Sequence, residues 1–266
     1  MTGFDDLIWH ADRMTLDGWI FRIQDFTNEP WMGDEEHFRF YKSRDIMNQY
    51  SRFWTAHRAL APGFRPRRVL ELGIWDGASA ALWCELLGPD KLVAIDNGVR
   101  SDGRYLTRFR QERGHEQRLK TVWSTCQTDK GKLDEIISNE FGGSLDVIID
   151  DASHDLASTE TSFEILFPRL VAGGLYAIED WSWPHWHDFQ DERHSWAMKA
   201  PLSMLIQKLL RAAGTTLDGG ARLIEGVSVQ QGLVVVERGH RELDPGRRFT
   251  LADYSLIRPQ DFDLFA

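Results

Sequence analysis

The sequence lacks the features that mark secreted and membrane-spanning proteins. It has two cysteines, Cys84 and Cys126, which are too few for a disulfide framework and lack a metal-binding spacing. No apolar run approaches the roughly 18 residues that a membrane span needs. The first residues show no basic stretch followed by an apolar one. We therefore expect a cytoplasmic protein in a reducing compartment, with no membrane partner.

Positive charge is also scarce. The chain has 31 Lys and Arg residues against 41 Asp and Glu residues, which gives a formal net charge of -10, and no basic run offsets it. Because such a surface repels a phosphate backbone, we expect no nucleic-acid partner. The 266 residues, 42% of them hydrophobic, are enough for one large folded domain.

Short apolar strands and amphipathic helices alternate from residue 67 onward. This rhythm is typical of a parallel sheet with helices on both faces, in which ligands bind at the carboxyl ends of the strands. Strands are predicted at 67–73, 91–96, 119–125, 145–150 and 173–180, and helices at 78–87, 104–114, 131–141 and 158–170.

The two ends of the chain follow a different pattern. After a predicted helix at 201–214, strands at 221–230 and 232–239 are too close for a crossover helix, which predicts an antiparallel hairpin. We predict an α/β fold with a Rossmann-like seven-stranded mixed sheet, helices on both faces and that terminal hairpin. Residues 1–60, with a helix at 43–60, are expected to form a helical cap, and residues 61–266 one compact domain.

The first strand-to-helix turn has the spacing E-x-G-x-x-x-G, with Glu71, Gly73 and Gly77. Glycines let the backbone approach a ligand closely, although an ordinary tight turn would contain them too. The spacing differs from the G-x-G-x-x-G of dinucleotide sites. An acidic residue before the turn suits a ligand with a cationic or hydroxyl-rich part.

Asp96 ends the second predicted strand, where a carboxylate can accept both hydroxyls of a ribose. Either a nicotinamide dinucleotide or S-adenosylmethionine could use it, and the alternative is a residue that only caps the turn. Gln127, after the third strand, could contact an adenine. Ser79 and Asn97 lie beside these motifs and are further candidates for binding a cofactor.

The fourth strand ends in "DDASHD" and the fifth in "IED". Neighbouring parallel strands would bring Asp151, Glu179 and Asp180 to one edge, where three carboxylates repel one another unless a cation neutralises them. Oxygen ligands suit Mg²⁺. His154 would lie near that ion and could take a proton from a hydroxyl. Asp residues here could also be simple caps, which is how we interpret Asp155.

The turn, Asp96 and the hairpin together resemble class I S-adenosylmethionine-dependent methyltransferases over about residues 67–240. "DDASHD" followed by "FPRLVAGGLYAIEDW" resembles the Mg²⁺-dependent sugar O-methyltransferases of macrolide biosynthesis, the mycinamicin and macrocin type. The resemblance implies that Asp151, Glu179 and Asp180 bind Mg²⁺ and that His154 is the general base. It also implies that Asp150 faces the methionine part of S-adenosylmethionine and that the protein is a homo-oligomer.

The stretch after the fifth strand is rich in tryptophan. Trp181, Trp183 and Trp186 are expected to form a wall of the acceptor pocket, because aromatic faces pack well on sugar rings. His185 and His187 could bind a transition metal, but a surface or stacking role is favoured.

The predicted function is S-adenosylmethionine- and Mg²⁺-dependent O-methylation of a small-molecule hydroxyl, in first place on a sugar of a glycosylated natural product in antibiotic biosynthesis. One alternative is a binding or cyclase-like accessory protein that transfers no methyl group. The other is a nicotinamide-dependent oxidoreductase, which the absence of G-x-G-x-x-G disfavours.

Overall fold

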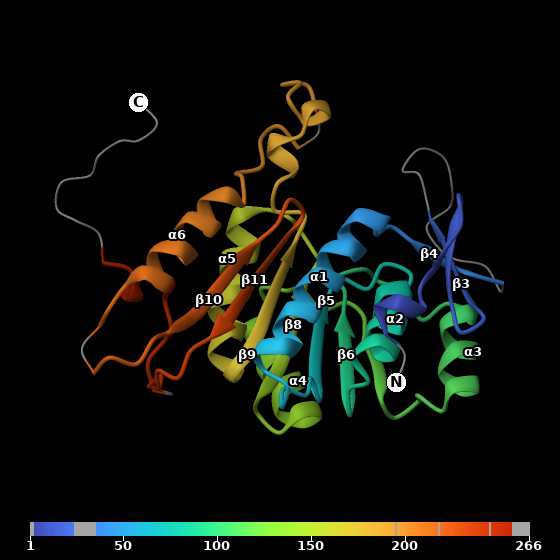
Figure 1. The fold of residues 1–266 in the computed structure, drawn as a ribbon, viewed down its shortest axis with the longest axis horizontal. Coiled ribbons are helices and arrows are strands. Elements are labelled where there is room, and N and C mark those ends of the chain that lie inside the picture. Colours follow the sequence, from blue (N-terminus) through green and yellow to red (C-terminus); the bar gives the residue numbers. More distant parts are fainter. Residues whose placement is uncertain (1–2, 24–35, 195, 218, 245, 257–266) are drawn as a thin grey trace.

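The computed structural model describes residues 3–23, 36–194, 196–217, 219–244 and 246–256. Its central feature is a mixed sheet of seven strands (Figure 1), which are β5 (Arg68–Leu72), β6 (Lys91–Ile95), β7 (Leu119–Val122), β8 (Leu145–Asp150), β9 (Leu170–Glu179), β10 (Ile224–Val229) and β11 (Leu233–Arg238). The strand order is β10-β11-β9-β8-β5-β6-β7. Strands β5 to β9 are parallel, and β11 pairs antiparallel with both β9 and β10. The predicted sheet and its terminal hairpin are confirmed.

Helices cover both faces of this sheet, namely α1 (Arg44–Leu60), α2 (Ala78–Leu87), α3 (Arg104–Arg113), α4 (Lys130–Phe141), α5 (Leu156–Leu166) and α6 (Ser203–Gly214). Successive side chains of a strand point to opposite faces. Val147 and Ile149 accordingly pack in a core with residues of α1, α2 and α3, whereas Ile148 packs in a second core with residues of α4, α5 and α6. In a sheet covered on both faces, ligands bind at the carboxyl ends of the strands.

The N-terminal segment corrects the prediction of a helical cap. The predicted helix at 43–60 is present as α1, but four strands precede it, which are β1 (Ile8–Trp9), β2 (Arg13–Leu16), β3 (Trp19–Ile23) and β4 (Phe38–Phe40). Asp17 and Gly18 join β2 to β3 with φ angles of 48° and 83°. An Asp-Gly pair between alternating apolar residues is a strong hairpin signal, and the expectation of helix overlooked it.

This small sheet packs against α2 and α3. The Trp19 ring lies 5.1 Å from Tyr105 and 4.9 Å from Phe109, both on α3, in edge-to-face geometry. The buried residues of β2 to β4 belong to the same hydrophobic core as one face of the large sheet. The chain that leaves β4 is therefore held close to the carboxyl ends of the central strands. A domain boundary at residue 60 stays a prediction.

Short 3-10 helices complete the described structure, at Phe4–Asp6, Phe167–Arg169, Trp183–His185, His187–Phe189 and Leu251–Tyr254. Asp155 caps α5 as predicted, since its carboxylate accepts a hydrogen bond of 3.1 Å from the backbone N–H of Ser158. No helix among the described residues is long and apolar enough to cross a membrane.

The turn after β5 lies directly against the turn after β8. Gly73 has a φ of +97°, and a Cβ atom there would lie 2.2 Å from the carbonyl oxygen of Asp151. The backbone N–H of Asp151 in turn donates to the carbonyl of Leu72 at 3.0 Å. A glycine is therefore needed at position 73 for both its torsion and its close contact.

Gly73→Ala should cost about 2–4 kcal/mol of unfolding free energy, because left-handed strain and overpacking add. Gly88 is a matched control: its φ is +57°, but a Cβ there would meet nothing within 4 Å. Gly88→Ala should cost only about 1 kcal/mol. Urea denaturation of both variants measures the difference, and equal costs would contradict the close contact.

Candidate active site

A cavity of about 280 Å³ opens at the carboxyl ends of the central strands. Five of the eight residues predicted to bind a cofactor line it, namely Gly73, Ser79, Asp96, Asn97 and Gln127. The prediction did not include Trp75, Arg100, Cys126 and Ser153, which also line the cavity. Asp151 lies on the same wall, so the cavity adjoins the predicted metal site.

Asp96 fixes the turn that follows β5. Its Oδ2 accepts hydrogen bonds from the backbone N–H groups of Ile74 at 3.0 Å and Trp75 at 3.1 Å, and its Oδ1 accepts one from Gly98 at 2.7 Å. The turn-capping alternative is therefore present in the structure. Since a carboxylate has about four acceptor positions, one remains for a ligand hydroxyl.

Glu71 and Gly77 do not line the cavity. Glu71 is fully buried, and no hydrogen bond of ordinary geometry reaches its carboxylate oxygens among the described residues, although the side chains of Ser79 and Trp83 are close enough to lower its pKa. Burial raises its pKa to about 8, against the opposing attraction of Lys42. At Gly77 a Cβ atom would lie 2.6 Å from the Leu106 side chain, so this glycine lets α2 pack against α3. Direct cofactor binding by either residue stays a prediction.

Asp150 also lies behind the cavity wall. Its Oδ2 accepts hydrogen bonds of 2.8 Å from the hydroxyls of both Ser162 and Tyr176. Burial raises the pKa of Asp150 to about 6, although these two bonds lower it. Gln127 connects Asp150 to the wall, because its Nε2 lies 3.5 Å from Oδ1 and its Oε1 accepts from the Ser153 N–H at 3.1 Å. Cofactor binding by Asp150 stays a prediction.

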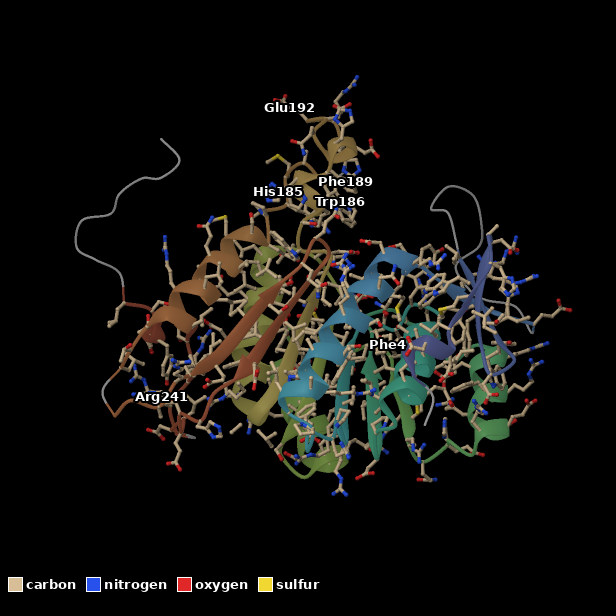
Figure 2. The ribbon with its side chains drawn as sticks, viewed as in Figure 1. Phe4, His185, Trp186, Phe189, Glu192 and Arg241 are labelled. Carbon is tan, nitrogen blue, oxygen red and sulfur yellow. The ribbon has the colours of Figure 1, made fainter. Side chains whose placement is uncertain are left out.

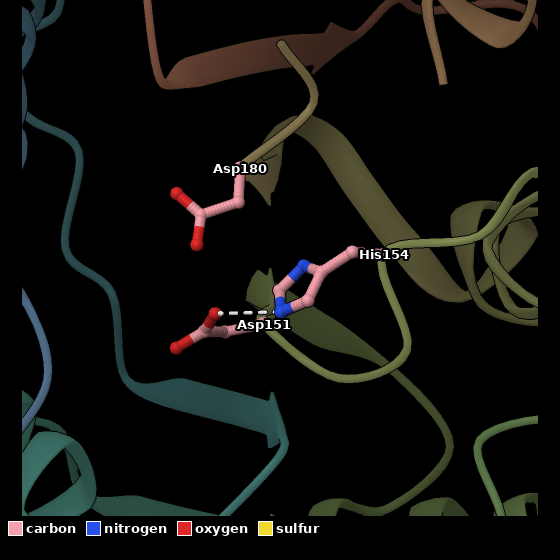
Figure 3. A group of neighbouring side chains, drawn as sticks. All are labelled: Asp151, His154 and Asp180. Atoms are coloured by element: carbon pink, nitrogen blue, oxygen red, sulfur yellow. Dashed lines mark ion pairs between the residues drawn. The ribbon is translucent and has the colours of Figure 1, made fainter. Parts of the chain in front are cut away.

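Three predicted site residues meet at the edge of the cavity. One ligand atom from each of Asp151, His154 and Asp180 lies within 4.8 Å of the others, and an ion pair joins Asp151 to the imidazole (Figure 3). His154 Nε2 is 3.7 Å from Asp151 Oδ1. Burial, together with the charge of Asp151, raises the pKa of Asp180. The predicted base thus lies beside two of the three predicted metal ligands.

Glu179, the third predicted metal ligand, binds two residues that the sequence did not single out. Its Oε2 accepts from Lys42 Nζ at 2.7 Å, and its Oε1 accepts from the Tyr50 hydroxyl at 2.7 Å. Lys42 Nζ also donates to Asp151 Oδ2 at 2.5 Å. Burial lowers the pKa of Lys42, but the charges of Asp151 and Glu179 raise it more, so the ammonium stays charged.

No local pattern could have identified Lys42 or Tyr50. Lys42 follows β4 and lies 137 positions from Glu179 along the chain, and Tyr50 lies 129 positions from it, on α1. Only the packing of the N-terminal segment brings them to the carboxylates. Their place in the site therefore follows from the tertiary fold and not from the local sequence.

The three predicted pocket tryptophans lie in different surroundings. The indole N–H of Trp181 donates to the carbonyl of Gln230 at 2.8 Å, and that of the buried Trp183 donates to the carbonyl of His154 at 3.0 Å. Trp186 is 37% exposed and lies with His185 and Phe189 on the segment that projects beyond the sheet (Figure 2). A role in acceptor binding stays a prediction for all three.

Lys42→Met should lower the free energy of unfolding by about 3–5 kcal/mol at neutral pH, because it leaves the buried Glu179 and the partly buried Asp151 without their cation. Lys130→Met is the control, since Lys130 pairs with Asp134 on the surface and its loss should cost at most about 1 kcal/mol. Urea denaturation without divalent ions measures both. A similar cost for the two variants would contradict the compensating role of Lys42.

Asp150 should make stability fall as pH rises from about 4 to about 6. Its pKa is about 6 in the folded protein against an ordinary 3.8, so the folded state holds this proton more tightly than the unfolded chain. A shift of this size corresponds to roughly 3 kcal/mol. Asp150→Asn removes this titration, so its stability relative to wild type should rise across that window in urea denaturation. Parallel pH curves for the two proteins would refute the assignment.

Comparison with known proteins agrees with this geometry. A family profile described as a methyltransferase domain matches residues 70–181. Demethylmacrocin O-methyltransferase of Streptomyces fradiae is 28% identical over 77% of this chain and 47% of its own length. Mycinamicin VI 2''-O-methyltransferase of Micromonospora griseorubida is 32% identical over 46% of this chain and 29% of its own length. The chain thus spans less than half the length of these curated relatives.

A solved structure of the MycE methyltransferase from the mycinamycin biosynthetic pathway, in complex with Mg and SAH, is 27% identical. It superimposes with a TM-score of 0.52 over 74% of this chain and 51% of that one. The predicted resemblance is confirmed: the chain shares the fold of the MycE methyltransferase, its residues 70–181 match a methyltransferase-domain profile, and it is similar to the sugar O-methyltransferases of macrolide biosynthesis.

Proposed function

We propose that this chain is an S-adenosylmethionine- and Mg²⁺-dependent O-methyltransferase that modifies a sugar hydroxyl of a glycosylated natural product. The position of His154 carries the proposal, because its imidazole lies beside Asp151 and Asp180 where the cavity meets the carboxylate edge, the group formed by Asp151, Glu179 and Asp180. That arrangement suits removal of a proton from a hydroxyl next to a methyl donor. The relatives named above support the reaction class.

The residues at the edge fit a divalent cation. Asp151, Glu179 and Asp180 bring three carboxylates, and Lys42 contributes one positive charge, so two negative charges remain when all three are ionised. A carboxylate-rich group with one imidazole suits a hard ion such as Mg²⁺. Asp151 and Asp180 would hold it. Glu179 could join them through lone pairs that Lys42 and Tyr50 do not use.

Different residues of the protein have different roles in the proposed reaction. When bound, S-adenosylmethionine supplies the methyl group and the divalent ion supplies positive charge beside the acceptor oxygen. The turn at Gly73 and the carboxylate of Asp96 hold the donor in the cavity. His154 Nε2 accepts the hydroxyl proton, and Asp151 Oδ1 stabilises the resulting imidazolium from 3.7 Å. Alignment of the two reacting groups provides much of the rate increase.

The relatives suggest the class of acceptor. Two further similar proteins from Streptomyces species carry names that specify methylation of a rhamnosyl tetracenomycin and of an olivosyl oleandolide. The exposed Trp186 ring offers an apolar face suited to a sugar. Homo-oligomerisation and a cytoplasmic location stay predictions.

A methyl-transfer assay tests the proposed function. The purified protein is incubated with Mg²⁺, methyl-labelled S-adenosylmethionine, and mycinamicin VI, demethylmacrocin, a rhamnosyl tetracenomycin or catechol as acceptor. Mass spectrometry should detect a labelled methyl group on a glycosylated acceptor. Binding of S-adenosylmethionine without transfer to any acceptor would favour the accessory role, and tight binding of NAD instead would favour an oxidoreductase.

His154→Gln should lower turnover by about 10²–10⁴-fold, because the acceptor hydroxyl loses its general base. S-adenosylmethionine affinity, measured by calorimetry, should hardly change. His240→Gln, at an exposed position after β11, is the control and should keep full turnover. Addition of EDTA should also stop the reaction. Undiminished activity in EDTA would reject the metal's role, and full activity of His154→Gln would reject the base.

A further inference from the structure

His154 has an unusual backbone conformation. Its φ is 53°, in the left-handed region that few residues other than glycine adopt. Such a conformation persists only where the surroundings hold it, and it often occurs at functional sites. The residue before it is already fixed on one side, because the Ser153 N–H donates to Gln127 Oε1 at 3.1 Å.

Two further contacts of this loop come from the segment between β9 and α6. The indole N–H of Trp183 donates to the carbonyl oxygen of His154 at 3.0 Å. The ammonium of Lys199 donates to the carbonyl oxygen of Ser153 at 3.0 Å. These carbonyls belong to the two peptide groups on either side of the His154 Cα atom. The segment therefore restrains the backbone φ and ψ of His154, which set the direction of the Cα–Cβ bond that carries the imidazole.

A third residue of the same segment packs beside the imidazole. The Trp196 ring lies 6.2 Å from the His154 ring and 5.1 Å from the Trp183 ring. Lys199 Nζ lies 4.0 Å from the centre of the Trp196 ring, which adds a cation–π contact. The tryptophan thus links the two hydrogen-bond donors into one group of contacts.

We infer that Trp183 and Lys199 are positioning residues that hold His154 in the orientation it needs as a base. This inference rests on the proposed function for the role of His154, but the contacts themselves do not depend on it. The segment then has two parts. Its inner residues, Trp183, Trp196 and Lys199, support the loop that carries the base. Its outer residues, including His185 and Trp186, are exposed to solvent (Figure 2).

The histidine signals of the protein in NMR spectra test this inference without an acceptor. The chain has nine histidines, and His154→Gln assigns the imidazole signal of residue 154 by its disappearance. Trp183→Phe keeps an aromatic ring and removes only the N–H donor. Lys199→Met removes the second donor, and Lys199→Arg restores one. All spectra are recorded with S-adenosylhomocysteine as the bound probe.

We expect Trp183→Phe and Lys199→Met each to shift and broaden the His154 signal, while Lys199→Arg returns it toward the wild-type position. Trp186→Phe is the matched control: its indole N–H donates to Ser182 Oγ instead, so the His154 signal should stay unchanged. Affinity for S-adenosylhomocysteine should be the same in all variants, because none of the substituted residues lines the cofactor cavity.

An unchanged His154 signal in both Trp183→Phe and Lys199→Met would overturn the inference. Lys199 is only partly buried, so its variants keep the test valid if Trp183→Phe fails to fold. Full methyl transfer by His154→Gln would instead reject the proposed base while leaving the NMR result on positioning intact. The two failures are therefore distinguishable.

Discussion

The arrangement of the candidate active site depends on several carboxylates that lie close together at the carboxyl ends of the central strands. Parallel strands end with Glu71 near the tip of β5, Asp151 just after β8, and Glu179 at the tip of β9. Ionised carboxylates this close repel one another, and Glu71 and Glu179 also lose favourable hydration on burial. Lys42 compensates part of this cost, because its ammonium lies between Asp151 and Glu179. The rest of the negative charge is what makes the edge suitable for a divalent cation.

Two segments outside the regular strand and helix alternation complete the site from different sides. The N-terminal segment supplies Lys42 after β4 and Tyr50 on α1. The segment between β9 and α6 supplies Trp183 and Lys199, which contact the loop that carries His154. The central sheet thus places the carboxylates, while the added segments compensate part of their charge and support the loop that carries the imidazole.

The sequence predicted the parts of the fold that have a local signal. Periodic apolar residues indicated the strands and helices from residue 67 to 239, the close spacing of the last two strands indicated the hairpin, and Asp155 was recognised as a cap. The Asp17–Gly18 hairpin also had a local signal, which the expectation of a helical cap overlooked. Lys42 had none, because the packing of distant segments determines its contacts. The chemical roles of the site residues stay predictions.

The contact between Gly73 and Asp151 also joins the cavity to the carboxylates at the ends of β8 and β9. The turn that borders the cavity and the first residue of the carboxylate edge touch through backbone atoms, and a backbone hydrogen bond joins Leu72 to Asp151. Backbone is stiffer than a side chain, so no flexible side chain lies between the turn and Asp151 to accommodate a displacement of either one. A small movement of the first turn would therefore move Asp151 with it, which makes the cavity and the carboxylate edge one mechanical unit.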